Sequence, residues 1–222
     1  MRIRLFEAAA LACVLGIADL AAAQNASTKP GADGPYPVAV GDHWTIETKD
    51  EISGEIKDAR KVVVTETSAG EIAVRSDVPG TGRSANLVYD RSWNLVRDDQ
   101  WRYSPNDGQG IRTPLSPTAK WKFSCDSING ATGAIWKRTG SSSVVGEERV
   151  TTKAGVFNTY VIETNFSAKN TKDPTRTNEV TLRTWYSNDI GRWVKRNSIV
   201  RQSGHVFTNQ TFELTEFSHK KQ

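Results

Sequence analysis

Cysteine is scarce in this sequence, which has only two in 222 residues. Cys13 lies in an apolar stretch near the N terminus, and Cys125 lies far along the chain. If that stretch is removed, Cys125 has no partner for an internal disulfide, so a domain of about 200 residues must be held together by its hydrophobic core. Phe123 and Cys125 fall on one face of an alternating segment. This pattern is typical of a buried structural thiol.

Long hydrophobic runs are also absent beyond the N terminus, where no stretch reaches the roughly 18 apolar residues of a membrane span. We therefore expect a soluble mature protein without a transmembrane segment. The chain itself begins with the basic residues Met1–Arg4, continues with the interrupted apolar stretch Leu5–Ala23, and reaches small residues before Gln24. This order predicts a secretory signal peptide over residues 1–23, cleaved after Ala23. The protein would then be periplasmic or secreted.

Cys13 offers an alternative. The segment Ala10–Cys13 faintly resembles a bacterial lipoprotein box, in which Cys13 would be lipidated and would tether the protein to a membrane. Against this, few residues separate Arg4 from Cys13, and the apolar stretch continues beyond the cysteine.

The charge of the chain is only mildly basic, at +4. The predicted signal peptide contributes nothing to it, because Arg2 and Arg4 balance Glu7 and Asp19. Such a charge permits contact with anionic envelope components without requiring it. Export also removes the protein from nucleic acid, so we expect no nucleic-acid partner.

Signatures of catalysis and metal binding are missing. His43, His205 and His219 have no metal-site spacing, and no cysteine cluster accompanies them. The chain has no Gly-x-Ser-x-Gly motif, and Ser141–Ser143 is interpreted as a flexible hairpin tip. We predict no catalytic residue, no metal site and no cofactor. A non-enzymatic protein is therefore favoured over an enzyme.

What the sequence does contain is a period of two. Alternating apolar and polar residues occur, for example, in Glu71–Arg75, Tyr160–Phe166 and Phe212–Thr215. This period, with β-branched and aromatic residues, predicts an all-β protein: an antiparallel meander of ten to twelve strands forming a curved sheet, half-barrel or barrel. Turn signals separate the segments: Ser53-Gly54, Ala69-Gly70, Pro79-Gly80, Asn129-Gly130, Ala154-Gly155 and Asp189–Gly191.

The organisation of the chain follows from composition. Residues 24–37 are rich in Pro, Gly and small polar residues and are interpreted as a flexible linker, residues 38–217 as a single β domain, and residues 218–222 as a frayed tail. Similar turn and aromatic landmarks indicate two pseudo-repeats within the domain, residues 38–103 and 118–217.

Two motifs in the second half resemble a known family. Val150–Ile162 has a strand, an Ala-Gly-x-Phe turn and a second strand, and Thr184–Lys195 has a Trp-Tyr pair, a short turn, a glycine and a strand. Both are similar to motifs of the uncharacterised TapB-like families of bacterial envelope proteins. The resemblance covers residues 118–202, with Gly41–Trp44 as weaker support. It implies a curved antiparallel sheet or half-barrel akin to lipoprotein-carrier folds, and it implies no activity or catalytic residue.

Tryptophan is the unusual component, because seven are present and several lie beside cations. Basic and aromatic residues on one sheet could stack rings or hold a lipid under its anionic head group. The alternative is simple alternation, with tryptophan inward and Lys or Arg outward. On the first interpretation, the candidate ligand-binding residues are Trp121, Trp136, Trp185, Trp193, Arg192 and Lys195.

These observations leave three hypotheses for function. The first is a non-enzymatic binding or carrier protein of the bacterial envelope, whose apolar concavity takes a lipid-like, hydrophobic or anionic ligand. The second is a structural or interaction protein that pairs an exposed sheet edge with another envelope protein. The third is a hydrolase. The identity of the ligand and the oligomeric state are left open by the sequence.

Overall fold

The computed structural model describes residues 38–106 and 111–219, so the predicted signal peptide and linker lie outside the described residues. No helix in these ranges is long and apolar enough to cross a membrane. The described chain instead forms twelve strands: β1 (His43–Asp50), β2 (Ile56–Thr67), β3 (Glu71–Val78), β4 (Arg83–Asp90), β5 (Leu95–Arg97), β6 (Trp101–Ser104), β7 (Lys120–Asn129), β8 (Ile135–Thr152), β9 (Gly155–Asn170), β10 (Thr177–Ser187), β11 (Arg192–Gln202) and β12 (His205–Ser218).

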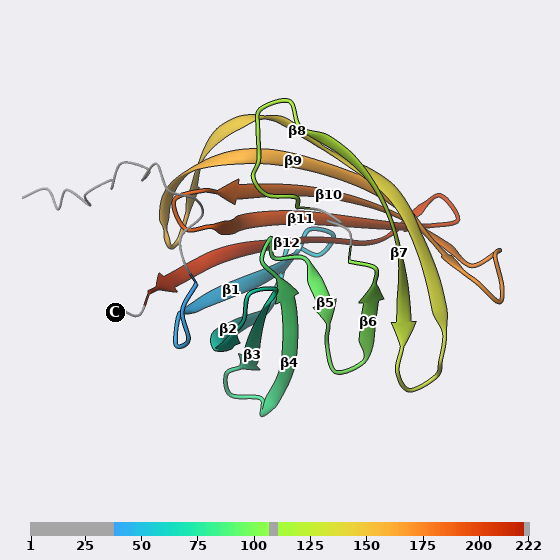
Figure 1. Cartoon of the computed structure of the whole chain (residues 1–222), viewed down its shortest axis with the longest axis horizontal. Coiled ribbons are helices and arrows are strands. Elements are labelled where there is room, and N and C mark those ends of the chain that lie inside the picture. Colours follow the sequence, from blue (N-terminus) through green and yellow to red (C-terminus); the bar gives the residue numbers. More distant parts are fainter. Residues whose placement is uncertain (1–37, 107–110, 220–222) are drawn as a thin grey trace, which may run out of the picture.

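The strands form a closed antiparallel barrel. Each strand pairs with the next one along the chain, and β1 pairs with β12 to close the sheet. The predicted all-β meander of ten to twelve strands is therefore confirmed, and it closes as a barrel. Figure 1 shows that the long strands β8 to β12 form one wall, whereas β2 to β6 form a shorter wall opposite them. In particular, β5 and β6 have only three and four residues.

Alternation along the strands places apolar side chains inside the barrel, as the period of two predicts. In β7, Trp121, Phe123 and Cys125 are buried, whereas Lys120 and Lys122 are exposed. Cys125 has 2% of its surface exposed, so its prediction as a buried thiol is confirmed.

One end of the barrel is filled. We call it the packed end; here the strands β1, β7 and β11 begin, and Trp44 and Trp93 meet with ring centroids 5.1 Å apart. The loop between β6 and β7 also contributes to it, because Ile111 is fully buried and its backbone exchanges two hydrogen bonds with the Asn94 side chain. The main buried side chains of this end are Trp44, Ile72, Trp93, Ile111, Trp121, Ile162, Tyr186, Val194 and Leu214.

Two local predictions are changed by the structure. Ser141–Ser143 was expected to be a hairpin tip, but it lies inside β8, and Ser142 is buried with its hydroxyl 2.8 Å from that of Thr164. A run of serines can thus remain in a strand when a neighbouring strand supplies a hydrogen-bond partner. The barrel also extends slightly further than predicted. Ser218 belongs to β12, and His219 Nδ1 lies 3.2 Å from a carboxylate oxygen of Asp42.

The landmarks of the two predicted pseudo-repeats lie in strands whose numbers differ by six. Trp44 is in β1 and Trp121 in β7, while Tyr89 is in β4 and Tyr186 in β10. The division into two similar halves remains a prediction.

Candidate ligand-binding cavity

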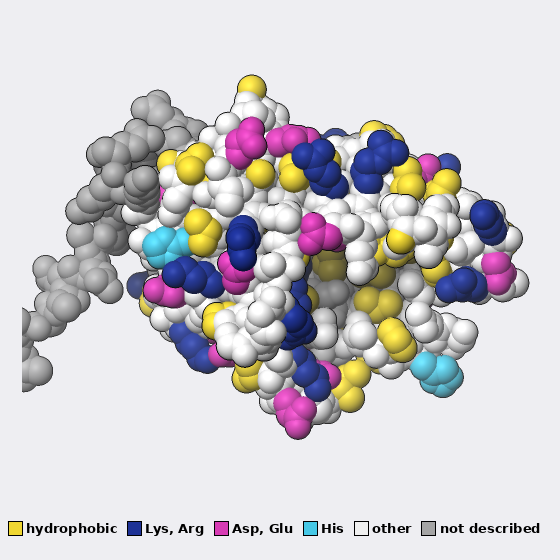
Figure 2. All heavy atoms as spheres, turned by 90° about the horizontal axis from the view of Figure 1, so that it is seen from below, with side chains coloured by type: hydrophobic (Ala, Val, Ile, Leu, Met, Phe, Trp, Pro, Cys, Tyr) yellow, Lys and Arg dark blue, Asp and Glu magenta, His cyan; other side chains and the backbone are white. Residues whose placement is uncertain are grey.

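The other end of the barrel encloses a cavity of about 550 Å³. We call this the open end; it carries the turns that follow the odd-numbered strands, such as β3, β5 and β7. Figure 2 shows a hollow near the middle of the face on which these turns lie, with hydrophobic side chains inside it and a basic side chain beside it. The volume falls within the range of roughly 300–1,000 Å³ that is typical of small-molecule sites.

The wall of the cavity is mainly apolar and aromatic. The side chains come from almost every strand, because the inward positions of the whole barrel converge on the lumen. Most of this lining is formed by Ile46, Val62, Leu87, Tyr89, Trp93, Leu95, Tyr103, Phe166, Val180, Leu182, Trp193, Val200 and Phe212.

The charged side chains that line the cavity are all basic among the described residues. Arg60, Arg138 and Arg196 reach the cavity, and among the described residues no aspartate or glutamate lines it. Arg60 is neutralised by Asp58, two residues earlier on the same face of β2, with nitrogen–oxygen distances of 3.2 and 2.9 Å. Although burial opposes ionisation of Asp58, Arg60 holds its pKa below the ordinary value. The cavity therefore retains the positive charges of Arg138 and Arg196.

Arg196 lies in the deeper part of the cavity. Its Nε donates to the hydroxyl of Thr184 over 3.0 Å, and its guanidinium lies 5.1 Å from the ring centroid of Trp193. Burial lowers its pKa to about 10, while the neighbouring Tyr89 acts in the opposite direction. Arg196 therefore stays cationic at neutral pH.

Arg192 lies behind the same part of the wall and is buried among three tryptophans. Its guanidinium is 3.8 Å from the ring centroid of Trp44, 4.8 Å from that of Trp93 and 5.2 Å from that of Trp193. Burial lowers the pKa of Arg192 to about 9, so this group also carries its charge at pH 7. Cation–π contacts of this kind offset part of the cost of burying a charge.

Arg138 lies near the open end, four residues into β8. Its guanidinium lies over the ring of Tyr103 at 4.6 Å and over that of Phe166 at 5.4 Å. Its Nε is buried and has no hydrogen-bond partner among the described residues. Burial raises the pKa of Tyr103, whereas the charge of Arg138 opposes that rise.

The six residues selected from the sequence do not form one site. Trp193 lines the cavity, Arg192 lies behind it and Trp121 is buried in the packed end. Trp136 is half-buried and lies beside Arg176, with 5.4 Å between the guanidinium and the ring centroid.

Trp185 and Lys195 lie on the outer face of the barrel. The register pairs them with each other, whereas Tyr186 pairs with Trp193 on the inner face. Trp185 donates from Nε1 to Glu148 over 2.8 Å. Trp185 and Tyr186 point to opposite faces as neighbours on a strand ordinarily do, whereas the β-bulge at Val194 places Lys195 on the opposite face from Trp193.

Sequence reasoning missed Arg60, Arg138 and Arg196 as cavity residues. The simple alternation rule holds for Trp121, whose lysine neighbours are exposed. Its assignment of arginine to the outer face fails for Arg138, because residues two apart on a strand share a face and Arg138 therefore points inward with Trp136. That spacing was the available signal.

Potential metal ligands are scattered among the described residues. No group of three or more His, Cys, Asp or Glu side chains in them is arranged to hold a metal ion. The three histidines are dispersed: His43 and His219 lie near the packed end, and His205 is exposed where β12 begins.

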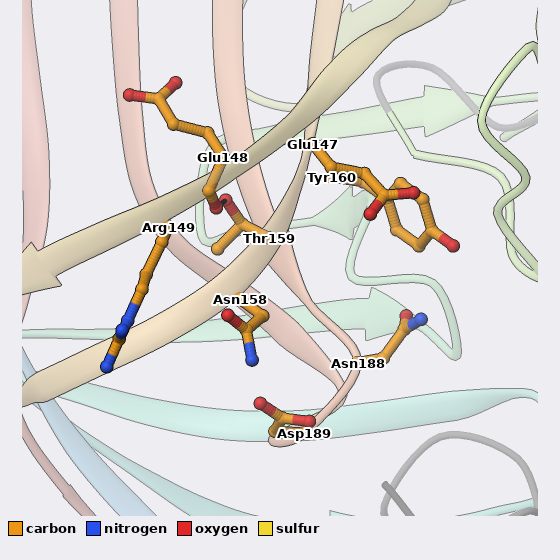
Figure 3. Close-up of a pocket in the computed structure, with 8 residues that line it drawn as sticks. All are labelled: Glu147, Glu148, Arg149, Asn158, Thr159, Tyr160, Asn188 and Asp189. Carbon is orange, nitrogen blue, oxygen red and sulfur yellow. Dashed lines mark hydrogen bonds between the residues drawn. The ribbon is translucent and has the colours of Figure 1, made fainter.

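A second, more polar depression lies on the outer surface, between the β8–β9 pair and the turn that joins β10 to β11. Figure 3 shows that its side chains spread in different directions, with the Glu148 carboxylate pointing away from Asp189 and the Arg149 guanidinium lying to one side of it. Glu148 is already engaged by Trp185. Because the groups do not converge, this depression is the weaker candidate.

The fold and the cavity thus define a closed β-barrel with an apolar, cationic lumen. No family model and no curated protein matches the chain, so the resemblance to TapB-like families is not confirmed.

Solved structures do match. A presumed lipoprotein from Parabacteroides distasonis ATCC 8503 is 13% identical with a TM-score of 0.51, over 84% of this chain and 100% of that one. The hypothetical lipoprotein YmcC from Escherichia coli (K12) is 11% identical with a TM-score of 0.50, over 81% and 86%. A presumed exported protein with a YmcC-like fold, from Bacteroides fragilis NCTC 9343, is 13% identical with a TM-score of 0.42, over 84% and 99%. The first two likenesses show that this chain shares their fold.

Proposed function

We propose that this protein is an exported binding protein of the bacterial envelope whose barrel holds a small amphipathic anion. The observation that carries the proposal is the cavity, which combines an apolar wall with three arginines and no carboxylate from the described residues. An apolar molecule gains free energy by burying its surface there, and an anionic group compensates the buried positive charge. A cavity in place of a filled core also supports a carrier over a purely structural protein.

Export is supported by two independent observations. Residues 1–23 have the order of a secretory signal, and two proteins of the same fold are named as lipoproteins. Cleavage after Ala23 and lipidation of Cys13 predict different masses for the mature protein. Mass spectrometry of the protein recovered from cell envelopes distinguishes them.

Binding is tested with three probes of equal chain length: dodecanoate, dodecanol and dodecylammonium. We expect dodecanoate to bind with a stoichiometry of one and dodecylammonium not to bind, measured by calorimetry below the concentrations at which the probes aggregate. Dodecanoate at 100 times its Kd should stabilise the protein by about 2.7 kcal/mol. Absence of dodecanoate binding, or equal binding of dodecylammonium, would overturn the proposal.

A second candidate function is binding to another envelope protein. Sheet-edge pairing loses its basis, because β1 pairs with β12 and the described sheet has no free edge. A different surface favours this candidate, since two neighbouring hairpins expose apolar side chains: Ile52, Ile56, Val206 and Phe207. If it is correct, Phe207→Ser should abolish co-purification of one stoichiometric partner while leaving dodecanoate binding unchanged.

A further inference from the structure

The arginines around the cavity differ in how far their guanidinium groups are already engaged. Arg60 forms a salt bridge with Asp58. Arg192 is packed against Trp44 and two other tryptophans, and Arg196 donates to Thr184 while lying against Trp193. Arg192 also has one buried nitrogen, Nη1, without a hydrogen-bond partner among the described residues, but Arg192 is not part of the cavity wall.

Arg138 lines the cavity and forms a side-chain hydrogen bond with Tyr103, and it retains free donor capacity at Nε. The rings of Tyr103 and Phe166 fix the plane of its guanidinium, and its buried Nε has no partner among the described residues. Phe166 is itself fixed, because Gly140 packs so closely on it that a Cβ atom at position 140 would collide with the Phe166 side chain. A guanidinium held by its faces presents its edge, which is the geometry that binds a carboxylate or phosphate through two hydrogen bonds.

The position of Arg138 in the barrel is far from the packed end, so the cavity extends from Arg138 in one direction, toward the packed end. Across the sheet it pairs with Ala168 of β9, six residues from Ile162 at the packed end. At about 3.3 Å per residue, this separation is roughly 20 Å along the strand. The wall near Arg138 includes polar side chains such as Asn178, whereas the deeper wall includes Trp93 and Trp193.

We infer that Arg138 binds the anionic group of the ligand near the open end, with the apolar chain of the ligand directed toward Trp93 and Trp193. The inference rests on the proposed function and adds to it the orientation of the ligand and its head group, a carboxylate or a phosphate monoester. The rival arrangement places the anion at Arg196, deep in the barrel, with the chain at the open end.

The first test uses dodecanoate and substitutions of Arg138. Because charge-assisted hydrogen bonds are lost, Arg138→Gln should weaken dodecanoate binding by about 10- to 100-fold. Arg138→Lys keeps the charge but not the planar fork, so a smaller loss is expected. Arg102→Gln is the matched control, since Arg102 is exposed on β6, and its binding should equal that of the native protein.

The second test reads the orientation directly. Bromine quenches tryptophan fluorescence on contact, and 2-bromododecanoate and 12-bromododecanoate carry it at opposite ends of one chain. The contribution of Trp193 is the part of the quenching that disappears in Trp193→Phe. This part should be larger for 12-bromododecanoate than for 2-bromododecanoate.

The outcomes separate the two proposals. If the native protein does not bind dodecanoate, the proposed function fails. If dodecanoate binds but Arg138→Gln, shown to be folded by its urea unfolding curve, binds it equally well, only the assignment of Arg138 fails. Stronger quenching of Trp193 by 2-bromododecanoate would overturn the orientation and favour Arg196 as the anion site.

Discussion

The packed end and the open end of this barrel are built from the same strands but are filled differently. At the packed end, Ile72, Ile162 and Leu214 are completely buried and three tryptophans occupy the centre. At the open end, inward positions carry smaller or polar residues such as Ser76, Ala168 and Ser198. A barrel of about eight strands is just filled by its own side chains, so twelve strands leave space unless large residues occupy it. The choice of inward side chains therefore decides where the cavity lies.

Shortening one leucine at each end should produce the largest difference in the free energy of unfolding between the two ends. Leu214→Ala at the packed end should lower the free energy of unfolding by about 2–5 kcal/mol, because it creates a void among buried neighbours. Leu182→Ala at the cavity should cost only about 1 kcal/mol, since that side chain already borders open space. Urea unfolding measures both, and equal losses would show that the ends do not differ in packing.

Enlarging one serine at each end gives the next largest effect. Ser142→Leu should destabilise the protein by about 2–4 kcal/mol, because it overpacks the packed end and deprives Thr164 of its partner. Ser198→Leu projects into the cavity, so we expect stability near that of the native protein but dodecanoate binding weakened about 10-fold or more. Tight dodecanoate binding by folded Ser198→Leu would place the ligand elsewhere.

Two glycines of β8 test how tightly the wall beside Arg138 is packed. Gly140 lies two residues from Arg138, and Gly146 lies further along the strand. Gly140→Ala should lower stability by about 1–3 kcal/mol, because the added Cβ meets the backbone of Asn165 and the side chain of Phe166. Gly146→Ala meets nothing within 4 Å and should be neutral or slightly stabilising. If Gly140→Ala unfolds at the same temperature as Gly146→Ala in differential scanning calorimetry, the wall beside Arg138 is more adaptable than described.

The smallest expected effect is a pH dependence located at the packed end. Burial lowers the pKa of His219 below its ordinary value, and Asp42 only partly opposes this. The unfolded chain then binds more protons than the folded one as the pH falls below about 6.5, so His219 reduces stability in acid and has no effect above that pH.

His219→Gln should therefore flatten the loss of stability between neutral and mildly acidic pH by a small amount. His205→Gln is the control, because that side chain is exposed at the open end. A flatter profile in His205→Gln, with none in His219→Gln, would contradict the assignment.

The elements of the fold were largely predictable, whereas the site was not. Turn signals such as Pro79-Gly80 lie between strands as expected, and Gly80 has a φ of 76°, which few other residues adopt. Trp193 was selected from the sequence and does line the cavity. Trp185 and Lys195, selected with it, lie on the outer face. Without the bulge between β10 and β11, Lys195 would share the face of Trp193. Local sequence gives no clear signal for such a bulge.

Sequence by itself determined that this chain alternates as strands, where those strands turn, and that Cys125 is buried, because these properties depend on neighbours along the chain. Only the tertiary structure decided that the sheet closes and that Arg138 and Arg196 face a common cavity. These two arginines belong to strands far apart in the sequence, and closure of the barrel brings them to one lumen. The physical reason is that alternation defines two faces of each strand, but only pairing with the other strands decides which face is enclosed.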